Sequence, residues 1–356
     1  MVTDAATSPD PASAPLGDPT SGRSAITTQE GLLVLSRAEI ARLLSFSDYV
    51  DAVAAALRAA AAGRAVAPPA SALHVADGSF HAKAGALMDD SGTIVAIKLN
   101  GNFPGNPAAH GLPTVQGVIY LADGRNGRPL ALMDSIEITI NRTGAATTLA
   151  ARHLARADSR VATICGAGVQ GRIQAVAIAA AARLEHLHVW DARPEAAAAL
   201  AADLARELRL DARPSDDLTP VRNSDIVVTC TSAQQAFLKR DLIRPGTFIA
   251  AVGADNVDKQ EIDPALFACA RVVVDSLEQC GEIGDLHHAL LAGTIAPDGV
   301  HASLAEIVAG TKPGRRDARE ITLFDSSGLG LQDVAAACAL YRRALATGVG
   351  TRLVVN

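Results

Sequence analysis

A glycine-rich turn between an apolar strand and a helix places the strongest constraint on how this chain folds. Residues 161–165 (VATIC) are apolar, and Gly166-Ala-Gly168-Val-Gln-Gly171 follows them and opens a helical pattern. Gly166 permits a tight turn, Gly168 lets the backbone approach a pyrophosphate, and Gly171 allows close helix packing. Free N–H groups at the helix start attract phosphate oxygens. The segment predicts a dinucleotide-binding unit of the Rossmann type, and the alternative is a similar turn that binds nothing.

An acidic residue at the end of the next strand bears on which dinucleotide is bound. Asp191 lies 25 residues after Gly166 and follows the apolar segment 187–190. A carboxylate there binds both ribose hydroxyls and repels a 2′-phosphate, which favours NAD over NADP. Alternatively, Asp191 caps the helix that starts at Pro194. Arg193 is close enough in sequence to pair with a 2′-phosphate, so the sequence leaves NADP open.

The order of elements changes near residue 149, which indicates two kinds of sheet. After it, strands are expected at 161–165, 187–190, 225–229, 248–252, 272–274 and 321–324, with helices at 169–184 and 194–208. Such alternation gives right-handed crossovers and a parallel sheet. Before it, helices at 36–43 and 46–61 precede strands at 72–75, 80–84, 93–99 and 115–122. These consecutive strands indicate an antiparallel or mixed sheet, to which a final helix at 331–346 returns.

Composition narrows the compartment and the class of partner. Of 356 residues, 38 are acidic and 32 basic, and the formal charge of −6 opposes binding to nucleic acid or to anionic membranes. Aromatic residues, at 3%, are too few for platforms that stack single-stranded bases. The five cysteines show no C-x-x-C spacing, and no apolar segment suits a membrane span. We expect a cytoplasmic protein with reduced thiols, and a disordered tail at residues 1–26 because Pro, Ser, Ala, Asp and Gly dominate it.

Two lysines lie in strand-like segments, where burial of their charged ammonium groups would be unfavourable. Lys98 is part of the apolar segment 93–99, where an ammonium is costly to bury unless an anion pairs with it. A substrate carboxylate is one such anion. The alternative is an edge strand with the lysine in water. Lys83 has the same two interpretations with weaker support.

Arg142 and Asp255 are candidates for binding and catalysis. Arg142 precedes the nucleotide-binding segment, where a guanidinium can bind a carboxylate by two parallel hydrogen bonds; alternatively it pairs with Asp134 or Glu137. Asp255 follows the strand at 248–252, at the strand end where open α/β sheets place ligands. The alternative for Asp255 is a turn-forming residue.

No metal site is expected. His287 and His288 are adjacent, but neighbouring side chains diverge on a helix, and no nearby acid–histidine spacing completes a site.

Six separated motifs together resemble the ornithine cyclodeaminase/μ-crystallin family, over about residues 30–350. They are Lys98 with 100–106 (NGNFPGN), 111–114 (GLPT), 142–146 (RTGAA), 166–170 (GAGVQ), 252–255 (VGAD) with Lys259, and 324–328 (FDSSG). The resemblance implies an α/β protein with a Rossmann domain at 149–324. This domain is inserted into an α+β substrate-binding and dimerisation domain formed by 27–148 and 325–356. It also implies a homodimer.

The resemblance also implies roles for individual residues. Lys98 and Arg142 would hold the carboxylate of an amino acid, and Asp255 would act as the acid/base. The dinucleotide would be lined by Thr114, Arg142, Thr143, Val169, Gln170, Asp191, Thr231, Val252, Lys259 and Ser326. Two departures concern the substrate: Ala70 follows Pro68-Pro69 where the family often has an arginine, and Ser327 stands where cyclodeaminases tend to have an apolar residue.

The activity implied is transfer of hydride from the α-carbon of an amino acid to a nicotinamide. The resulting imine is then cyclised, as in ornithine cyclodeaminase, or hydrolysed, and ammonia leaves. Alanine dehydrogenase and cyclic ketimine reductase are alternatives within the same chemistry. A non-catalytic, ligand-binding protein like μ-crystallin is an alternative of another class.

Overall fold

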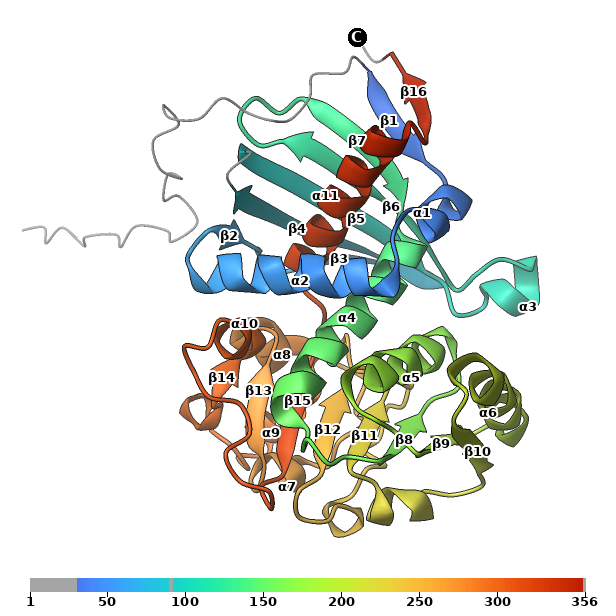
Figure 1. Ribbon diagram of the computed structural model, residues 1–356, viewed down its shortest axis with the longest axis vertical. Helices are drawn as coiled ribbons and strands as arrows, with labels where there is room; N and C mark the ends of the chain where they lie inside the picture. Colours follow the sequence, from blue (N-terminus) through green and yellow to red (C-terminus); the bar gives the residue numbers. More distant parts are fainter. Residues whose placement is uncertain (1–30, 90–91, 355–356) are drawn as a thin grey trace, which may run out of the picture.

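Two eight-stranded sheets form the frame of the protein (Figure 1). The structure is a computed structural model, and it describes residues 31–89 and 92–354; the tail expected at 1–26 lies outside these residues. Sheet A has the order β16-β1-β7-β6-β5-β4-β2, with β3 also on β4. Its strands are β1 (Leu32–Leu35), β2 (Ala65–Val66), β3 (Ser71–Val75), β4 (Gly78–Asp89), β5 (Gly92–Asn102), β6 (Val115–Asp123), β7 (Pro129–Asp134) and β16 (Thr351–Leu353). The β1–β7 pair is parallel and the others are antiparallel, so the expected mixed sheet is confirmed.

Sheet B is parallel throughout, in the order β10-β9-β8-β11-β12-β15-β13-β14. Its strands are β8 (Val161–Cys165), β9 (His186–Trp190), β10 (Asp211–Ser215), β11 (Ile226–Thr229), β12 (Phe248–Ala251), β13 (Arg271–Val274), β14 (Ala302–Ser303) and β15 (Thr322–Asp325). The chain leaves β8 toward β9 on one side and returns to β11 on the other. This reversal opens a crevice at the carboxyl ends of β8 and β11, where such sheets bind ligands.

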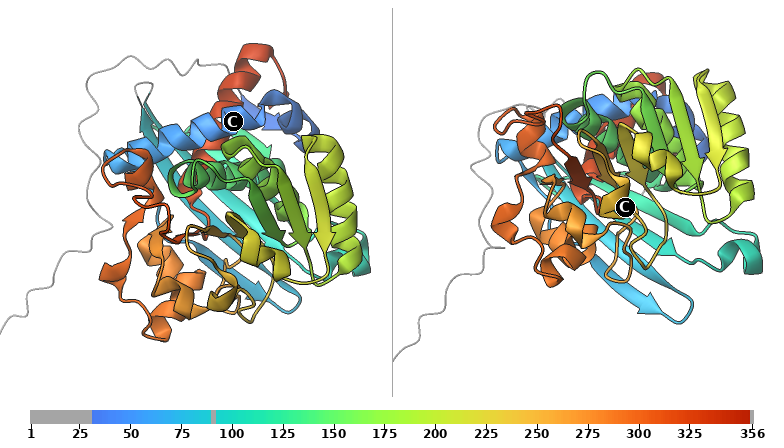
Figure 2. Two further views of the ribbon diagram at one scale, coloured as in Figure 1. Left: turned by 60° about the horizontal axis from the view of Figure 1, so that its bottom comes forward. Right: turned by 90° about the horizontal axis from the view of Figure 1, so that it is seen from below.

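Each sheet is packed against its own set of helices (Figures 1 and 2). Those that pack with sheet A are α1 (Arg37–Leu43), α2 (Phe46–Ala61) and α11 (Gly330–Thr347), and α3 (Asn106–His110) lies in the β5–β6 connection. Those around sheet B are α5 (Val169–Ala181), α6 (Pro194–Leu208), α7 (Pro264–Phe267), α8 (Leu277–Ile283), α9 (Asp285–Leu291) and α10 (Leu304–Val308). Short 3₁₀ turns occur at Thr219–Asn223, Arg240–Leu242 and Pro297–Gly299. Within the described residues, no helix combines the length and apolar character that crossing a membrane requires.

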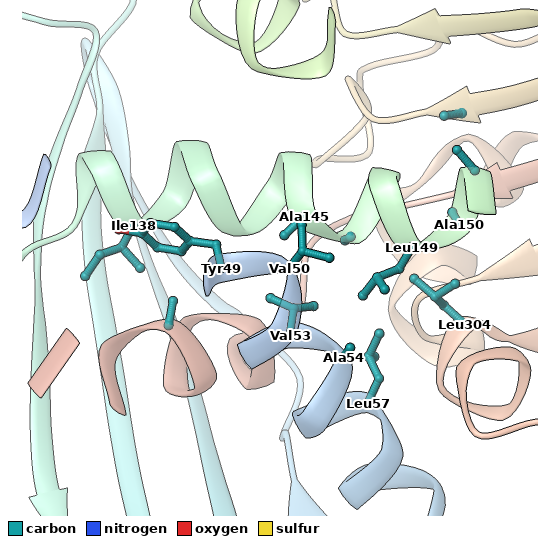
Figure 3. Close-up of a cluster of buried hydrophobic side chains, with 14 of the residues drawn as sticks. Tyr49, Val50, Val53, Ala54, Leu57, Ile138, Ala145, Leu149, Ala150 and Leu304 are labelled. Atoms are coloured by element: carbon teal, nitrogen blue, oxygen red, sulfur yellow. The ribbon is translucent and has the colours of Figure 1, made fainter. Parts of the chain in front are cut away.

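Helix α4 (Ile136–Leu154) connects the two layers, and α2 crosses it and packs against it (Figure 3). Tyr49, Val53 and Leu57 recur at helical spacing on α2 and are buried. They lie in one apolar cluster with the buried side chains of α4 and with Leu304 of α10. Helix α4 is continuous across residues 148 and 149, so the expected division into domains there stays a prediction.

Candidate functional site

A cavity of about 820 Å³ lies between the two layers, at the carboxyl ends of β8, β9 and β11. Sheet B and its loops contribute the glycine turn, the end of β9 and the loop after β11. The other wall comes from the α1, β5–β6 and α4 segments. Lining residues include Arg37, Pro113, Thr114, Thr139, Gly166, Gly168, Val169, Gln170, Asp191, Arg193, Thr231, Ser232 and Phe237.

The glycine turn has the geometry of a pyrophosphate cradle. Gly166 has a φ of +117°, and a Cβ on Gly171 would lie 2.0 Å from the carbonyl oxygen of Gly166. These two positions therefore require glycine for the fold itself. A Cβ on Gly168 would meet nothing within 4 Å, so the space in front of it is open. Helix α5 begins at Val169 without a side-chain cap, which leaves its first N–H groups free for phosphate oxygens.

Asp191 faces this turn. Its Oδ2 accepts a hydrogen bond from the backbone N–H of Ala167 at 2.7 Å, and its Oδ1 accepts one from the N–H of Arg193 at 2.9 Å. The N-cap of α6 is Arg193, so the alternative that Asp191 caps this helix is wrong. The carboxylate instead joins the end of β9 to the glycine turn and lines the cavity. The position of Asp191 in the cavity thus fits a dinucleotide whose ribose has a free 2′-hydroxyl.

Lys98 and Arg142 converge on one carboxylate that the sequence interpretation did not identify. Lys98 Nζ lies 2.7 Å from Asp333 Oδ2, and Arg142 Nε lies 3.0 Å from Asp333 Oδ1. Arg142 Nη1 also donates to Gln332 Oε1 at 2.8 Å. The three charged side chains are at most 6% exposed. Asp333 comes from the first turn of α11, so only the tertiary fold brings it to these cations.

The structure rules out the alternatives for both cations. Strand β5 lies between β4 and β6, so Lys98 is not on an edge strand in water. Arg142 pairs with neither Asp134 nor Glu137, because the Glu137 carboxylate pairs with Arg37 and Asp134 accepts the N–H of Ile136. Lys98 Nζ also lies 3.5 Å from Thr139 Oγ1. Thr139 lines the cavity, so the buried cations lie directly behind its wall.

Burial changes the proton affinity of this group. Removal from water lowers the pKa of Lys98 to about 7, and the nearby Arg142 and Lys83 act in the same direction, while Asp333 partly offsets them. Desolvation alone would raise the pKa of Asp333, but Arg142 and Lys98 hold it below its ordinary value. Asp333 is therefore ionised, and Lys98 titrates near neutral pH.

Lys83 belongs to the same region. It is the cross-strand neighbour of Lys98 in the β4–β5 pair. Its Nζ donates to the carbonyl oxygens of Ser327 at 2.9 Å and Gly328 at 2.7 Å. Desolvation, followed by the charge of Arg142, lowers the pKa of Lys83.

Asp255 follows β12 and lies beside Lys259. Its Oδ1 accepts a hydrogen bond from Lys259 Nζ at 2.7 Å, and about half of its side chain is exposed. Burial by itself would raise the pKa of Asp255, but Lys259, with Lys83 and His81, lowers it below the ordinary value. Asp255 is therefore an ionised carboxylate near neutral pH, as a base requires.

Two buried acids hold the loops around the site. Asp275 accepts hydrogen bonds from the hydroxyls of Ser326 and Ser327 and from the N–H of Gly328. Gln279 donates to Ser327 Oγ at 2.8 Å, so this hydroxyl is engaged on both sides. Glu261 accepts from the N–H and hydroxyl of Thr231 and from the N–H of Gly253, which ties the end of β11 to the end of β12. Neither acid carries a local sequence signal, because both act through contacts distant along the chain.

The predicted cofactor residues fall into two groups. The cavity wall contains Thr114, Gly166, Gly168, Val169, Gln170, Asp191, Arg193 and Thr231. The wall does not include Arg142, Thr143, Gly171, Val252, Lys259 and Ser326. Arg37 and Phe237 also line the cavity but are not among the predicted residues. The sequence around each of them carries no sign of nucleotide binding.

The side chains of His287 and His288 diverge less than expected, since their ring centroids are 5.2 Å apart. Their ring nitrogens bond to different segments, His287 Nδ1 to Gly281 O and His288 Nε2 to Lys259 O. Across residues 31–89 and 92–354, no cluster of three His, Cys, Asp or Glu side chains has the arrangement of a metal site.

The chain matches one known protein family over most of its length. A sequence model described as the ornithine cyclodeaminase/mu-crystallin family matches residues 31–348. The chain belongs to this family. The resemblance inferred from six motifs is thereby confirmed.

Solved structures of family proteins are similar over almost their whole length. An archaeal alanine dehydrogenase dimer with bound NAD is 35% identical, covers 90% of this chain and 98% of its own, and has a TM-score of 0.86. Thermococcus litoralis Δ1-pyrroline-2-carboxylate reductase, in complex with NADH and L-proline, is 35% identical with a TM-score of 0.86 and coverages of 90% and 100%. Paracoccus denitrificans iminosuccinate reductase, in complex with NAD⁺, is 33% identical with a TM-score of 0.85 and coverages of 91% and 100%. The expected Rossmann-type fold is thereby confirmed.

Proposed function

We propose that this member of the family is an NAD-dependent oxidoreductase of amino and imino acids. The observation that carries the proposal is the position of Lys98 and Arg142 behind the cavity wall that Thr139 lines, opposite the glycine turn and Asp191. NAD is favoured because Asp191 leaves little room for a 2′-phosphate. The NAD-bound relatives support the same choice.

The binding roles follow from charge and position. Lys98 and Arg142 hold the α-carboxylate of the substrate, and Asp333 keeps both cations oriented. Thr231 and Gln170 lie on the dinucleotide side of the cavity. The backbone of the glycine turn binds the pyrophosphate.

Asp255 moves the proton that hydride transfer requires. It takes a proton from the substrate ammonium, so that the α-carbon carries a neutral amine before its C–H bond breaks. When bound, NAD supplies the nicotinamide ring that accepts the hydride. Water then adds to the imine carbon and ammonia leaves. In total, an amino acid, NAD⁺ and water give a 2-oxo acid, ammonium, NADH and a proton.

The relatives also bear on whether the imine is reduced, hydrolysed or cyclised. The names of the three solved relatives favour a dehydrogenase or imine reductase over ring closure by a lyase. Cyclodeamination is the second candidate. The family as a whole supports it, since internal attack by a terminal amine uses the same imine.

We also propose a cytoplasmic homodimer. The five cysteines are all unpaired, as in a reducing compartment. One face of sheet A carries exposed apolar side chains, and the archaeal relative is a dimer. A second copy of the chain covers this face.

One experiment tests the reaction. The purified protein is mixed with a panel of amino acids plus NAD⁺ or NADP⁺, and with 2-oxo acids plus ammonia or cyclic imines and reduced cofactor. Nicotinamide absorbance and product mass are recorded together. Net NADH change with an oxo-acid or amine product supports the proposal, and a cyclic product without net NADH change identifies cyclodeamination. Absence of any product with every substrate would contradict an enzymatic role.

A further inference from the structure

Two lysines directly face each other across neighbouring strands. Lys83 of β4 pairs in register with Lys98 of β5. Cross-strand partners point to the same side of a sheet, here the side that carries the buried Lys98. Like charges in this arrangement repel, and burial strengthens the repulsion. The arrangement therefore calls for anions on this side of the sheet.

Within the described residues, a carboxylate of the protein contacts Lys98 directly, but none contacts Lys83. The charges of Arg142 and Lys83 lower the pKa of Lys98, and the charge of Arg142 also lowers that of Lys83. Asp333 forms ion pairs with Lys98 and Arg142 but not with Lys83. In the part of the chain that the structure describes, no carboxylate lies within 4.0 Å of Lys83 Nζ, which donates only to the carbonyls of Ser327 and Gly328. Asp255, Asp333 and Asp275 act on Lys83 from greater distances, so none of the three is in direct contact with its ammonium.

Lys83 also lies near the proposed substrate-binding groups, because it donates to the carbonyl of Gly328, where a Cβ would be 2.7 Å from Arg142 Nη1. Its charge and that of His81 act on Asp255, which extends from the opposite layer. His81 lies two residues before Lys83 on the same side of β4, and it pairs in register with Asn100. A substrate between Asp255 and the Lys98–Arg142 pair thus lies beside the Lys83 ammonium.

We propose that Lys83 binds a second anionic group of the substrate, and that the preferred substrates are dicarboxylic α-amino acids or their imines. This inference rests on the proposed function for the reaction, but it concerns which side chain the substrate carries. Lys98 and Arg142 hold the α-carboxylate and Lys83 holds the distal one. The hydrogen bonds from Lys83 to two carbonyls keep its ammonium in place before the substrate arrives.

A binding experiment tests the second anion site without turnover. Succinate and butyrate have the same number of carbons, but only succinate has two carboxylates. Calorimetric titration of the NAD⁺-saturated protein should give at least tenfold tighter binding of succinate, the usual range for a charge-assisted hydrogen bond. Equal affinities of the wild type would overturn the proposal, whether or not any substrate is turned over.

Variants then assign the effect to Lys83. Lys83→Met should remove the preference for succinate and leave butyrate binding within about threefold. Lys83→Arg should retain the preference, because the charge is kept. Lys239→Met is the matched control, because Lys239 is an exposed lysine, far from Lys83 in sequence, that pairs with Asp263. This variant should behave like the wild type. Retention of the succinate preference by Lys83→Met would overturn the assignment.

Kinetics separate this inference from the proposed function. Reduction of oxaloacetate with ammonia and NADH should exceed that of pyruvate with ammonia in kcat/KM, and Lys83→Met should narrow the ratio at least tenfold. Faster reduction of pyruvate or of a cyclic imine by the wild type would overturn the inference and leave the proposed oxidoreductase intact. An equal loss on all substrates, with an altered pH profile, would instead assign Lys83 to proton transfer and overturn the binding role.

Discussion

Asp333 determines how the two buried cations behave before a substrate binds. It pairs with Lys98 and Arg142 at once, and all three are nearly inaccessible to solvent. The proposed substrate carboxylate would therefore bind to cations that are already paired with Asp333. Preorganised groups lose less entropy on binding, so this arrangement favours tight and oriented capture.

Replacement of Asp255 by asparagine should affect chemistry more than binding. Asp255→Asn keeps the size of the side chain but removes the base, so kcat should fall about a hundredfold or more. NAD affinity should change little, because Asp255 does not belong to the cavity wall that would hold NAD. Stopped-flow measurement of hydride transfer and titration with NAD check the two parts. Asp258→Asn, on the same loop, is the control; near wild-type turnover by Asp255→Asn would return Asp255 to a turn-forming role.

Lys98 should make carboxylate binding depend on pH. Burial lowers its pKa to about 7 from an ordinary 10.5, so the unliganded side chain loses its proton as pH rises above 7. A bound carboxylate favours the ammonium, so binding takes up a proton in this range. Affinity for butyrate, measured with NAD⁺ present, should therefore fall between pH 7 and 9, by at most about tenfold per pH unit.

Lys98→Arg provides the comparison, because arginine stays charged over the whole range. Its affinity for butyrate should be nearly constant between pH 7 and 9. Parallel pH profiles for the two proteins would show that another group controls the titration.

The sequence could identify candidate residues but not their partners. Lys98 was notable because a lysine in an apolar strand needs an anion, and that reasoning is local. Asp333 is 235 positions further along, on a helix with no local sign of function, so only the fold reveals the pairing. The same holds for Asp275 and Glu261, which orient loops from other elements.

At the scale of elements, the turn from β8 into α5 separates two uses of glycine. Gly171 is required by packing, whereas Gly168 has free space in front of it. Gly168→Ala should therefore leave the melting temperature within about 2 °C but weaken NAD binding at least tenfold, because the added methyl occupies the pyrophosphate position. Thermal unfolding and calorimetry measure both effects.

Gly171→Ala is the contrasting variant. Its Cβ would lie 2.0 Å from a backbone oxygen, so the turn must shift and the protein should lose stability even without NAD. A large loss of stability in Gly168→Ala, or none in Gly171→Ala, would contradict this division of roles.

Elements with strong local patterns were predicted well, and those made by pairing were not. The expected helix at 46–61 and strand at 161–165 match α2 and β8. Strand β10 was missed because Pro214 is unfavourable inside a strand, and it is tolerated there because β10 lies at the sheet edge. Strands β1 and β16 are three or four residues long and exist through pairing with distant segments.

At the scale of the whole molecule, the outer face of sheet A is apolar and exposed. Leu73, Phe80, Ile97, Leu99 and Val118 share one face by their registers and are each at least 38% exposed. Helices α2 and α11 lie on the other face (Figures 1 and 2). An apolar face of this kind is typical of a protein interface.

Leu99→Asp should therefore shift the protein from dimer to monomer at micromolar concentration, because burying an unpaired carboxylate in an interface is costly. Sedimentation velocity measures the mass, and Val354→Asp, at another exposed apolar residue, serves as the control. A wild-type protein that is monomeric would contradict the proposed dimer, and a dimeric Leu99→Asp would place the interface elsewhere.

The pairing of β1 with β16 has a consequence for synthesis of the chain on the ribosome. Sheet B and its crossovers are contiguous from Val161 to Asp325, so they are complete before α11 is made. Sheet A has its first strand near one end of the chain and its last near the other, where Leu32 pairs with Leu353. The two facing lysines emerge early, but the carboxylate that neutralises Lys98 arrives on the last helix. The layer proposed to bind the substrate therefore acquires this charge balance only after sheet B has been made.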